Sequence, residues 1–329
     1  MELQGKKILV TGAGGFIGSH LTESLTETGA KVTAFIRYNS RNDHGLLEFL
    51  PAMTKENITI IQGDLRDSET IRNVMQGMEV VFHLGALIAI PYSYFRPTEV
   101  IETNIIGTSN VLNAAKLADV KKIVHTSTSE VYGTAQYVPI DEKHPLQAQS
   151  PYSASKIGAD KIAESFYRSY SLPIVTIRPF NTYGPRQSAR AVIPTIITQA
   201  LAKDVVYLGS LHPTRDLTYV EDTVNAFIKI AESENSIGEI INIGSNFEIS
   251  IGDLANKIIS LIGKRVEIIS KPERIRPQNS EVEKLLADNS KAKKLIGWKS
   301  IISLDEGLSR TIEWIKGNLG SYKANVFNV

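Results

Sequence analysis

The amino-acid sequence predicts an α/β fold, in which a doubly wound parallel sheet is followed by a smaller C-terminal α/β domain. Short runs rich in β-branched residues alternate with helical periods in the first half of the chain, as in parallel strands joined by helical crossovers. After Pro179 the alternation loosens and Gly, Pro and Arg become frequent, as in loops that hold a ligand. We predict one domain over 1–178 and a second over 179–329, with some later segments returning to the first.

Apolar runs of five or six residues predict the strands of the first domain. These runs are Lys7–Thr11, Lys31–Ile36, Ile58–Gln62, Val80–Leu84, Lys122–Thr126 and Ile174–Arg178. Helical periods predict helices at Ser19–Thr28, Ser68–Met75, Glu102–Ala118 and Tyr152–Tyr170. We therefore expect a sheet whose two faces are both covered by helices.

Composition excludes several classes of function. The chain has 329 residues, and 36 Lys and Arg against 35 Asp and Glu leave a net charge of +1. Such a balance creates no field that would gather nucleic acid or an acidic membrane surface. The absence of cysteine excludes disulfides and thiolate metal sites, and the six histidines show no ligand spacing, so we expect no metal.

The N-terminal segment and the hydropathy pattern set an expectation for location. Met1–Lys7 passes directly into the first strand-like run, which is too short for a signal peptide. No apolar stretch approaches the roughly 18 residues that a membrane-spanning helix needs. We therefore expect a cytoplasmic protein with no membrane partner.

A glycine-rich segment, Thr11–Gly18, follows the first strand and opens the first helix. Gly12 permits a tight turn, Gly15 lets the backbone approach a pyrophosphate, and Gly18 allows close helix–strand packing. The helix N-terminus adds free N–H groups and a positive dipole end. The spacing, G-x-x-G-x-x-G, differs from the commoner G-x-G-x-x-G, but its position predicts a Rossmann dinucleotide-binding loop. The expected contacts come from Gly12, Gly15, Phe16, Ile17 and Gly18.

The end of the second strand bears on which dinucleotide binds. Phe35–Arg41 contains no Asp or Glu that would hold the ribose 2′-hydroxyl of NAD. Arg37, with a hydroxyl or a second guanidinium of the same segment, could instead receive the 2′-phosphate of NADP. This favours NADP over NAD while leaving both open. Asp64 and Leu65 end the third strand, where a carboxylate can accept from the adenine amino group.

A Tyr-x-x-x-Lys motif marks the start of a long helix. Ser150 suits an N-cap and Pro151 the first helical position, which places Tyr152 and Lys156 one turn apart on one face. A tyrosine has a reference pKa of about 10, too high for a base at neutral pH. An adjacent ammonium and a positive nicotinamide ring would favour the phenolate. We therefore expect these two residues to be catalytic and to contact the cofactor.

The segment Thr126–Gly133 lies just beyond the fifth strand, where open α/β sheets place their ligands. Thr128 can bond a sugar hydroxyl, and Glu130 can act as a carboxylate base. With Ser129 between them, these residues complete the expected catalytic set.

Together these motifs resemble the extended short-chain dehydrogenase/reductases of the NAD-dependent epimerase/dehydratase family, which act on nucleotide sugars. The resemblance covers essentially the whole chain. It is carried by Gly12–Gly18, Gly63–Asp64, His83–Ala86, Thr128–Gly133, Tyr152–Lys156, Arg178–Asn181 and Arg215–Asp222.

Glu130 narrows the activity that this resemblance implies. Family 4-epimerases usually carry hydroxyl residues there, whereas the 4,6-dehydratases and UDP-glucuronate decarboxylases carry a Glu. The chain is most similar to LegB-type N-acetylglucosamine 4,6-dehydratases, implying a UDP-N-acetylglucosamine or GDP-linked substrate and a role in amino-sugar and polysaccharide biosynthesis. A decarboxylase, a 4-epimerase and a non-catalytic NADP-binding regulator remain alternatives. Glucose-type dehydratases have Asp in place of Ser129, so either Glu130 or a water held by Ser129 would protonate the leaving hydroxyl.

The resemblance also implies ligand contacts and an assembly. Asn181, Arg215 and Arg276 lie where the family holds the substrate diphosphate. The NADP or NAD would stay tightly bound and be regenerated in each turnover. Relatives pair the helices matching Glu102–Ala118 and Tyr152–Tyr170 into a four-helix interface, which implies a homodimer.

Overall fold

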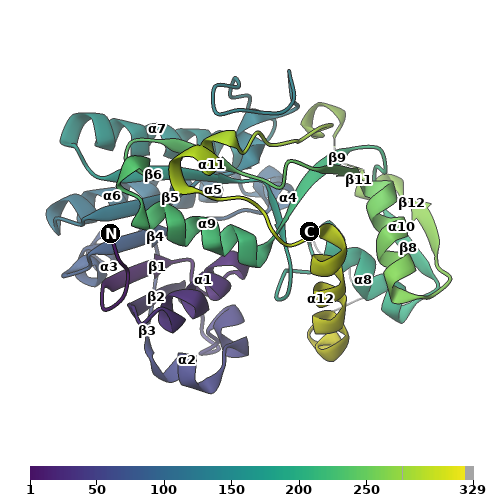
Figure 1. The fold of residues 1–329 in the computed structure, drawn as a ribbon, viewed down its shortest axis with the longest axis horizontal. Coiled ribbons are helices and arrows are strands. Elements are labelled where there is room, and N and C mark those ends of the chain that lie inside the picture. Colours follow the sequence, from purple (N-terminus) through teal and green to yellow (C-terminus); the bar gives the residue numbers. More distant parts are fainter. Residues whose placement is uncertain (276, 323–329) are drawn as a thin grey trace.

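A seven-stranded parallel sheet forms the centre of the computed structural model, which describes residues 1–275 and 277–322 (Figure 1). The strand order is β10-β6-β5-β4-β1-β2-β3, so the predicted doubly wound α/β fold is confirmed. Each of the six predicted strands agrees with the structure to within one residue at either end. The strands are β1 (Lys7–Thr11), β2 (Lys31–Arg37), β3 (Ile58–Gly63), β4 (Val80–His83), β5 (Lys122–Thr126), β6 (Ile174–Pro179) and β10 (Ile240–Ile243).

Apolar side chains cover both faces of this sheet. In β1, Ile8 and Val10 belong to one buried cluster and Leu9 to another, because successive residues of a strand point to opposite faces. The helices that pack on the first face are α1 (Phe16–Glu27) and α9 (Val220–Glu232), and those on the second are α3 (Ser68–Met75), α6 (Gly107–Leu117) and α7 (Pro151–Tyr170) (Figure 1). The sheet is therefore buried between two helical layers.

The C-terminal part of the chain builds two smaller sheets beside the large one (Figure 1). A three-stranded sheet contains β7 (Asn181–Tyr183), β9 (Thr214–Tyr219) and β11 (Glu248–Ser250). A two-stranded parallel sheet contains β8 (Val205–Leu208) and β12 (Glu267–Ser270). The surrounding helices are α8 (Val192–Ala202), α10 (Ile251–Ile262), α11 (Ser290–Ile296) and α12 (Leu304–Gly317). Beyond residue 178, β10 is a strand of the large sheet, and α9 packs on one face of that sheet.

Shorter helical segments connect these elements. They are η1 (Gly45–Phe49), α2 (Ala52–Glu56), α4 (Ile90–Phe95), α5 (Pro97–Ile101), η2 (Glu102–Ile106), η3 (Ser129–Tyr132), η4 (Glu234–Ser236), η5 (Pro272–Arg274), η6 (Gln278–Ser280) and η7 (Leu319–Ser321). The predicted helix at Glu102–Ala118 begins earlier than expected, because α5, η2 and α6 form one helical run from residue 97 to 117. Its middle turn, η2, is a π-helix.

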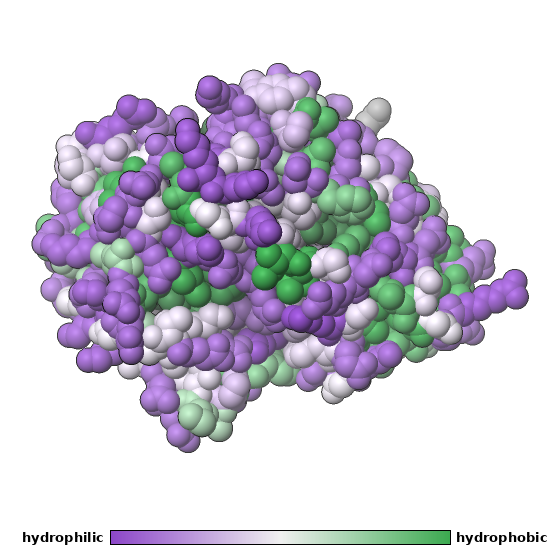
Figure 2. Space-filling view, viewed as in Figure 1, coloured by the Kyte–Doolittle hydropathy of each residue, from purple (hydrophilic) through white to green (hydrophobic). Residues whose placement is uncertain are grey.

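The surface shown in Figure 2 is largely hydrophilic, with hydrophobic side chains in separate groups. Among the described residues, no helix combines the length and the apolar character that crossing a membrane requires. Within the same residues, no three His, Asp or Glu side chains come together in a way that could hold a metal ion.

Candidate active site

A cavity of about 750 Å³ opens at the carboxyl ends of β1 and β4, where the strand order reverses and α/β sheets bind their ligands. It brings together predicted residues from the β1–α1 loop, the ends of β2 and β3, η3, α7 and β7. Those lining the cavity are Gly12, Gly15, Phe16, Ile17, Gly18, Arg37, Asp64, Leu65, Thr128, Glu130, Tyr152 and Asn181.

The β1–α1 loop fits a pyrophosphate because its glycines leave no room for side chains. Gly12 has φ +73°, and a Cβ there would lie 2.8 Å from the backbone nitrogen of Gly85. A Cβ on Gly18 would lie 2.2 Å from the carbonyl oxygen of Gly12. Helix α1 begins at Phe16 without a side-chain cap, so its first amides are available to an anion in the cavity. The loop can therefore hold the phosphates of a dinucleotide.

Carboxylates engage the arginines near the ends of β2 and β3, at one side of the cavity. The Nη2 of Arg37 lies 3.2 Å from an oxygen of Glu99 on α5. Asp64 accepts from Nη2 and Nε of Arg66, at 2.6 and 3.0 Å. The hydrogen bond from Arg66 holds the pKa of Asp64 below its usual value. Asp64 thus lies where it was predicted, but it is paired with a residue that the sequence did not indicate.

Helix α7 begins as predicted, with Ser150 as N-cap and Pro151 in the first turn. The Oγ of Ser150 accepts from the amide of Ser153, and the Ser153 Oγ accepts from the amide of Ser150, which forms a capping box. This start places Tyr152 on the cavity wall. Burial raises the pKa of Tyr152, and a hydrogen bond with Thr128 opposes that rise.

Lys156 lies one turn beyond Tyr152 and is buried behind the cavity wall. Its Nζ donates to the carbonyl oxygen of Thr126 at 2.7 Å. Burial lowers the pKa of Lys156 to about 8, and the negative charge of Asp160 limits the fall. The ammonium is thus held beneath the segment that carries the predicted base.

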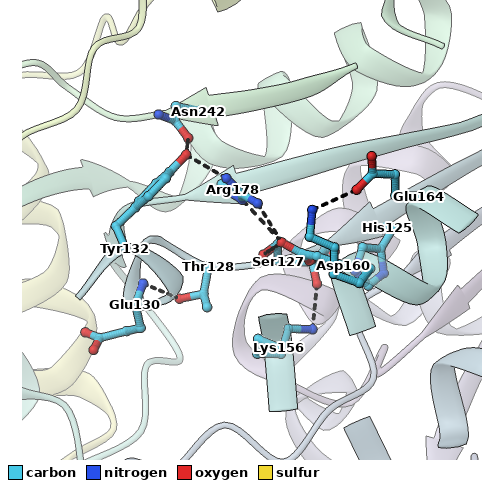
Figure 3. Close-up of polar contacts among 12 residues, drawn as sticks. His125, Ser127, Thr128, Glu130, Tyr132, Lys156, Asp160, Glu164, Arg178 and Asn242 are labelled. Carbon is cyan, nitrogen blue, oxygen red and sulfur yellow. Dashed lines mark hydrogen bonds and ion pairs between the residues drawn. The ribbon is translucent and has the colours of Figure 1, made fainter. Parts of the chain in front are cut away.

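Thr128 orients the turn that contains Glu130. Its Oγ1 accepts from the backbone amide of Glu130 at 3.2 Å and caps η3. The Glu130 side chain lines the cavity, and Figure 3 shows its carboxylate pointing away from the buried contacts around Asp160. Ser129 is buried and is not among the cavity-lining residues.

Asp160 forms a buried ionic centre that the sequence did not predict (Figure 3). Its carboxylate accepts from Ser127 Oγ at 2.8 Å and Arg178 Nη2 at 2.9 Å, and it lies 3.1 Å from the Nε2 of His125. Burial alone would raise the pKa of Asp160. The hydrogen bond with His125 and the charge of Arg178 outweigh burial and lower that pKa to about 2. A fixed negative charge therefore lies one helical turn from Lys156. The four-residue spacing of Lys156 and Asp160 is visible in the sequence and could have indicated this contact.

Arg178 extends this network toward η3. Its Nη1 donates to the hydroxyl of Tyr132 at 2.9 Å, and that hydroxyl donates to Asn242 Oδ1 on β10 at 2.7 Å. Figure 3 shows these contacts in one continuous chain. The helix of Lys156 and the turn of Glu130 are thereby joined through buried hydrogen bonds.

Asn104, in the π-helical turn η2, is a second positioning residue that sequence reasoning missed. Its Oδ1 accepts from the amide of Leu87 at 2.8 Å, and its Nδ2 donates to the carbonyl of Leu87 at 2.9 Å. The same Nδ2 lies 2.9 Å from Ser155 Oγ on α7. Asn104 therefore fixes the β4–α4 loop, which lines the cavity, against the helix of Tyr152.

The predicted diphosphate contacts differ in position. Asn181 lines the cavity, and its buried Nδ2 has no hydrogen-bond partner among the described residues, as expected of a donor awaiting a ligand. Arg215 does not line the cavity; it lies 3.1 Å from Glu281 and donates to the Thr214 carbonyl. Arg276 lies outside the described residues.

The fold and the cavity define a Rossmann-type α/β protein with the Tyr–Lys pair of the extended short-chain dehydrogenase/reductases. The chain belongs to the GDP-mannose 4,6 dehydratase family, whose model matches residues 9–311. It is thus an enzyme of the nucleotide-sugar dehydratase and epimerase family.

Individual relatives include both activities. The chain is 33% identical over 328 residues to a dTDP-D-glucose 4,6-dehydratase of Mus musculus, covering 97% of this chain and 91% of the relative. It is also 33% identical to a putative UDP-glucose 4-epimerase of Methanocaldococcus jannaschii, covering 94% and 99%. Among solved structures, DesIV, a dTDP-glucose 4,6-dehydratase from Streptomyces venezuelae with NAD and TYD bound, has a TM-score of 0.86. That match has 27% identity and covers 96% of this chain and 99% of DesIV.

Proposed function

We propose that this enzyme is a nucleotide-sugar 4,6-dehydratase that forms a 4-keto-6-deoxy sugar. The observation that carries the proposal is the carboxylate of Glu130 in the same cavity as Tyr152. Dehydration requires a base for the C5 proton in addition to the group that deprotonates the 4′-hydroxyl. A 4-epimerase moves only the C4 hydride and has no such requirement.

Oxidation at C4 uses Tyr152, Thr128 and Lys156. Tyr152 takes the proton of the 4′-hydroxyl while Thr128 holds that hydroxyl in place. When bound, the dinucleotide supplies the hydride acceptor and a positive ring charge that offsets the burial of the phenolate. The Lys156 ammonium, kept charged by Asp160, adds a second positive charge on the same side of Tyr152.

Elimination uses Glu130 twice. The C4 ketone acidifies the C5 proton, which Glu130 removes, and the resulting carboxylic acid returns that proton to the leaving C6 hydroxyl. Because Ser129 is buried and is not a cavity-lining residue, we assign this proton to Glu130 rather than to a water on Ser129. The original C5 proton leaves in the water, so the proton later added at C5 is balanced by the one that Tyr152 took from the 4′-hydroxyl. With the hydride that a bound dinucleotide would give back to C6, one water is the only net loss.

The substrate that we propose is UDP-N-acetylglucosamine or its GDP counterpart, on the basis of the sequence resemblance to the LegB-type dehydratases. The buried Nδ2 of Asn181, which lines the cavity and has no hydrogen-bond partner among the described residues, supports a contact with the substrate. We further propose that NAD or NADP remains bound through successive turnovers and that the enzyme acts as a homodimer. Exposed apolar side chains on η2, α6 and α7 support the dimer.

The proposal is tested by mass spectrometry of the products from a panel of UDP- and GDP-sugars, with no dinucleotide added. We expect UDP-N-acetylglucosamine or its GDP counterpart to give a product lighter by one water. An isobaric product would instead identify a 4-epimerase, and loss of CO₂ from UDP-glucuronate would identify a decarboxylase. Either result would overturn the dehydratase assignment.

Glu130→Gln tests the base directly. We expect product formation to fall about 10²- to 10⁴-fold, the usual range for a lost acid–base group, while absorbance of reduced dinucleotide still appears on addition of substrate. The matched control is Glu221→Gln, which neutralises a surface carboxylate paired with Arg310 and should leave turnover unchanged. Normal turnover by Glu130→Gln would refute the assigned role.

A further inference from the structure

Arg37, which the sequence predicts as the contact of a 2′-phosphate, is already paired with a carboxylate in the structure. Arg37 ends β2 and lines the cavity, and its Nη2 lies 3.2 Å from Oε1 of Glu99. The Arg37 side chain is 63% exposed, whereas that of Glu99 is 24% exposed, so Glu99 is the better anchored partner. The carboxylate that pairs with Arg37 is thus supplied by α5, 62 residues later in the chain.

Glu99 is fixed independently of Arg37. The hydroxyl of Tyr92, on α4, donates a hydrogen bond to its other oxygen, Oε2. This hydrogen bond, followed by the charges of Arg37 and Arg66, holds the pKa of Glu99 below its ordinary value although burial opposes it. Glu99 is therefore ionised at neutral pH and stays in place when Arg37 moves.

Two neighbouring arginines are also engaged by carboxylates. Arg66 is bound by Asp64 through Nη2 and Nε, and Arg41 lies 3.4 Å from Asp43. A 2′-phosphate, which carries close to two negative charges at neutral pH, would have to draw an arginine away from its carboxylate and remain near Glu99. A 2′-hydroxyl requires neither change.

We propose that Glu99 sets the dinucleotide preference of this enzyme by holding Arg37, so that the site selects NAD over NADP. Glu99 is a positioning residue that acts through Arg37. The inference deepens the proposed function and rests on its dinucleotide binding. It does not depend on which reaction the enzyme performs on the sugar.

The test measures dinucleotide binding without any turnover. Wild type, Glu99→Gln and the Arg37→Ala/Glu99→Gln double variant are freed of bound dinucleotide and titrated calorimetrically with NAD⁺ and with NADP⁺. Dinucleotides that co-purify from one expression host are released by denaturation and quantified by chromatography. Glu102→Gln is the matched control, because Glu102 lies on the adjoining turn and approaches Arg66 at 3.6 Å instead of Arg37.

We expect the wild type to bind NAD⁺ more tightly. In Glu99→Gln the affinity for NADP⁺ relative to NAD⁺ should rise about tenfold or more, as one charge-assisted hydrogen bond from Arg37 becomes available to the phosphate. The double variant should lose this gain, and Glu102→Gln should keep the wild-type ratio. A wild type that prefers NADP⁺, an unchanged ratio in Glu99→Gln, or an equal shift in Glu102→Gln would overturn the inference. Failure of the wild type to bind either dinucleotide would refute the proposed function itself.

Discussion

Asp160 is one buried residue that fixes the position of helix α7 relative to strands β5 and β6 at the candidate active site. It receives contacts from β5, β6 and the segment before Thr128, and it lies one helical turn from Lys156. The carboxylate makes little contact with solvent, so these contacts take the place of water in satisfying its charge. Removing the carboxylate would leave the guanidinium of Arg178 buried without its counter-ion.

We predict that Asp160→Asn lowers the free energy of unfolding at pH 7 by about 3–5 kcal/mol, as when one partner of a buried ion pair is lost. The folded-state pKa of Asp160, about 2, lies below its ordinary value of 3.8. Its ionisation therefore stabilises the fold fully above that ordinary value, and the contribution disappears as the pH falls through about 2.

Urea unfolding of both proteins between pH 7 and pH 2 checks this prediction. The difference in stability should be largest at pH 7 and should narrow toward pH 2. A difference that stays constant across this range would show that packing, rather than charge, accounts for the loss.

At the scale of elements, the β1–α1 loop is constrained by backbone packing. A Cβ on Gly18 would lie 2.2 Å from the carbonyl oxygen of Gly12 and 3.0 Å from the Cα of Ala13. Both neighbours belong to the backbone and cannot rotate away. Even the smallest side chain at this position must therefore displace the loop or the start of α1.

Gly18→Ala should weaken dinucleotide binding at least about tenfold, because the displaced amides no longer converge on the phosphates. Calorimetric titration with NAD⁺ measures the loss. Gly317→Ala is the control: Gly317 ends α12, a Cβ there meets nothing within 4 Å, and alanine favours the helix. Unimpaired binding of NAD⁺ by Gly18→Ala would exclude the β1–α1 loop as the site that binds the phosphates.

The elements whose signals are local were predictable from the sequence. Strand β1 is a compact apolar run, and the start of α7 at Ser150 and Pro151 follows from side-chain chemistry in adjacent residues. The π-helical turn η2 was not predictable, because the apolar pattern of Glu102–Ala118 does not reveal its changed hydrogen bonding. Partners remote in sequence, such as Glu99 for Arg37, could not be found either, since only the folded chain brings them together.

The Arg215–Asp222 segment illustrates why a motif does not specify every role of its residues. The carboxylate of Asp216 accepts from the backbone amides of Ser245, Asn246 and Ala287 at 2.7, 3.0 and 3.1 Å. These contacts tie β9 to the loop after β10 and to a distant C-terminal segment. The motif thus also maintains the fold around the predicted ligand contact.

At the scale of the whole molecule, apolar side chains remain exposed on the helices predicted to form a dimer. Ile106 on η2, Leu117 at the end of α6 and Tyr170 at the end of α7 are 50%, 69% and 53% exposed. Their burial against a second copy would remove apolar surface from water, which is the main favourable contribution to such association.

We predict that Leu117→Glu shifts the enzyme from dimer to monomer, because the interface would have to bury an unpaired charge. Light scattering coupled to size-exclusion chromatography reports the mass directly. Ile301→Glu, at a position 72% exposed on the loop after α11, should leave the mass unchanged. A wild-type chain that elutes as a monomer would contradict the proposed assembly.

Helix α9 and strand β10 complete the large sheet and its helical layer but come late in the sequence. This order has a consequence for synthesis of the chain on the ribosome. Strand β6 pairs with β10, and α1 packs against α9, although 40 residues, 180–219, lie between the end of β6 and the start of α9. A nascent chain that ends at residue 178 therefore exposes an unpaired strand edge and the apolar surface of α1, both of which favour aggregation. The segment that contains α9 and β10 must therefore emerge from the ribosome before the first half of the chain can bury this edge and this surface.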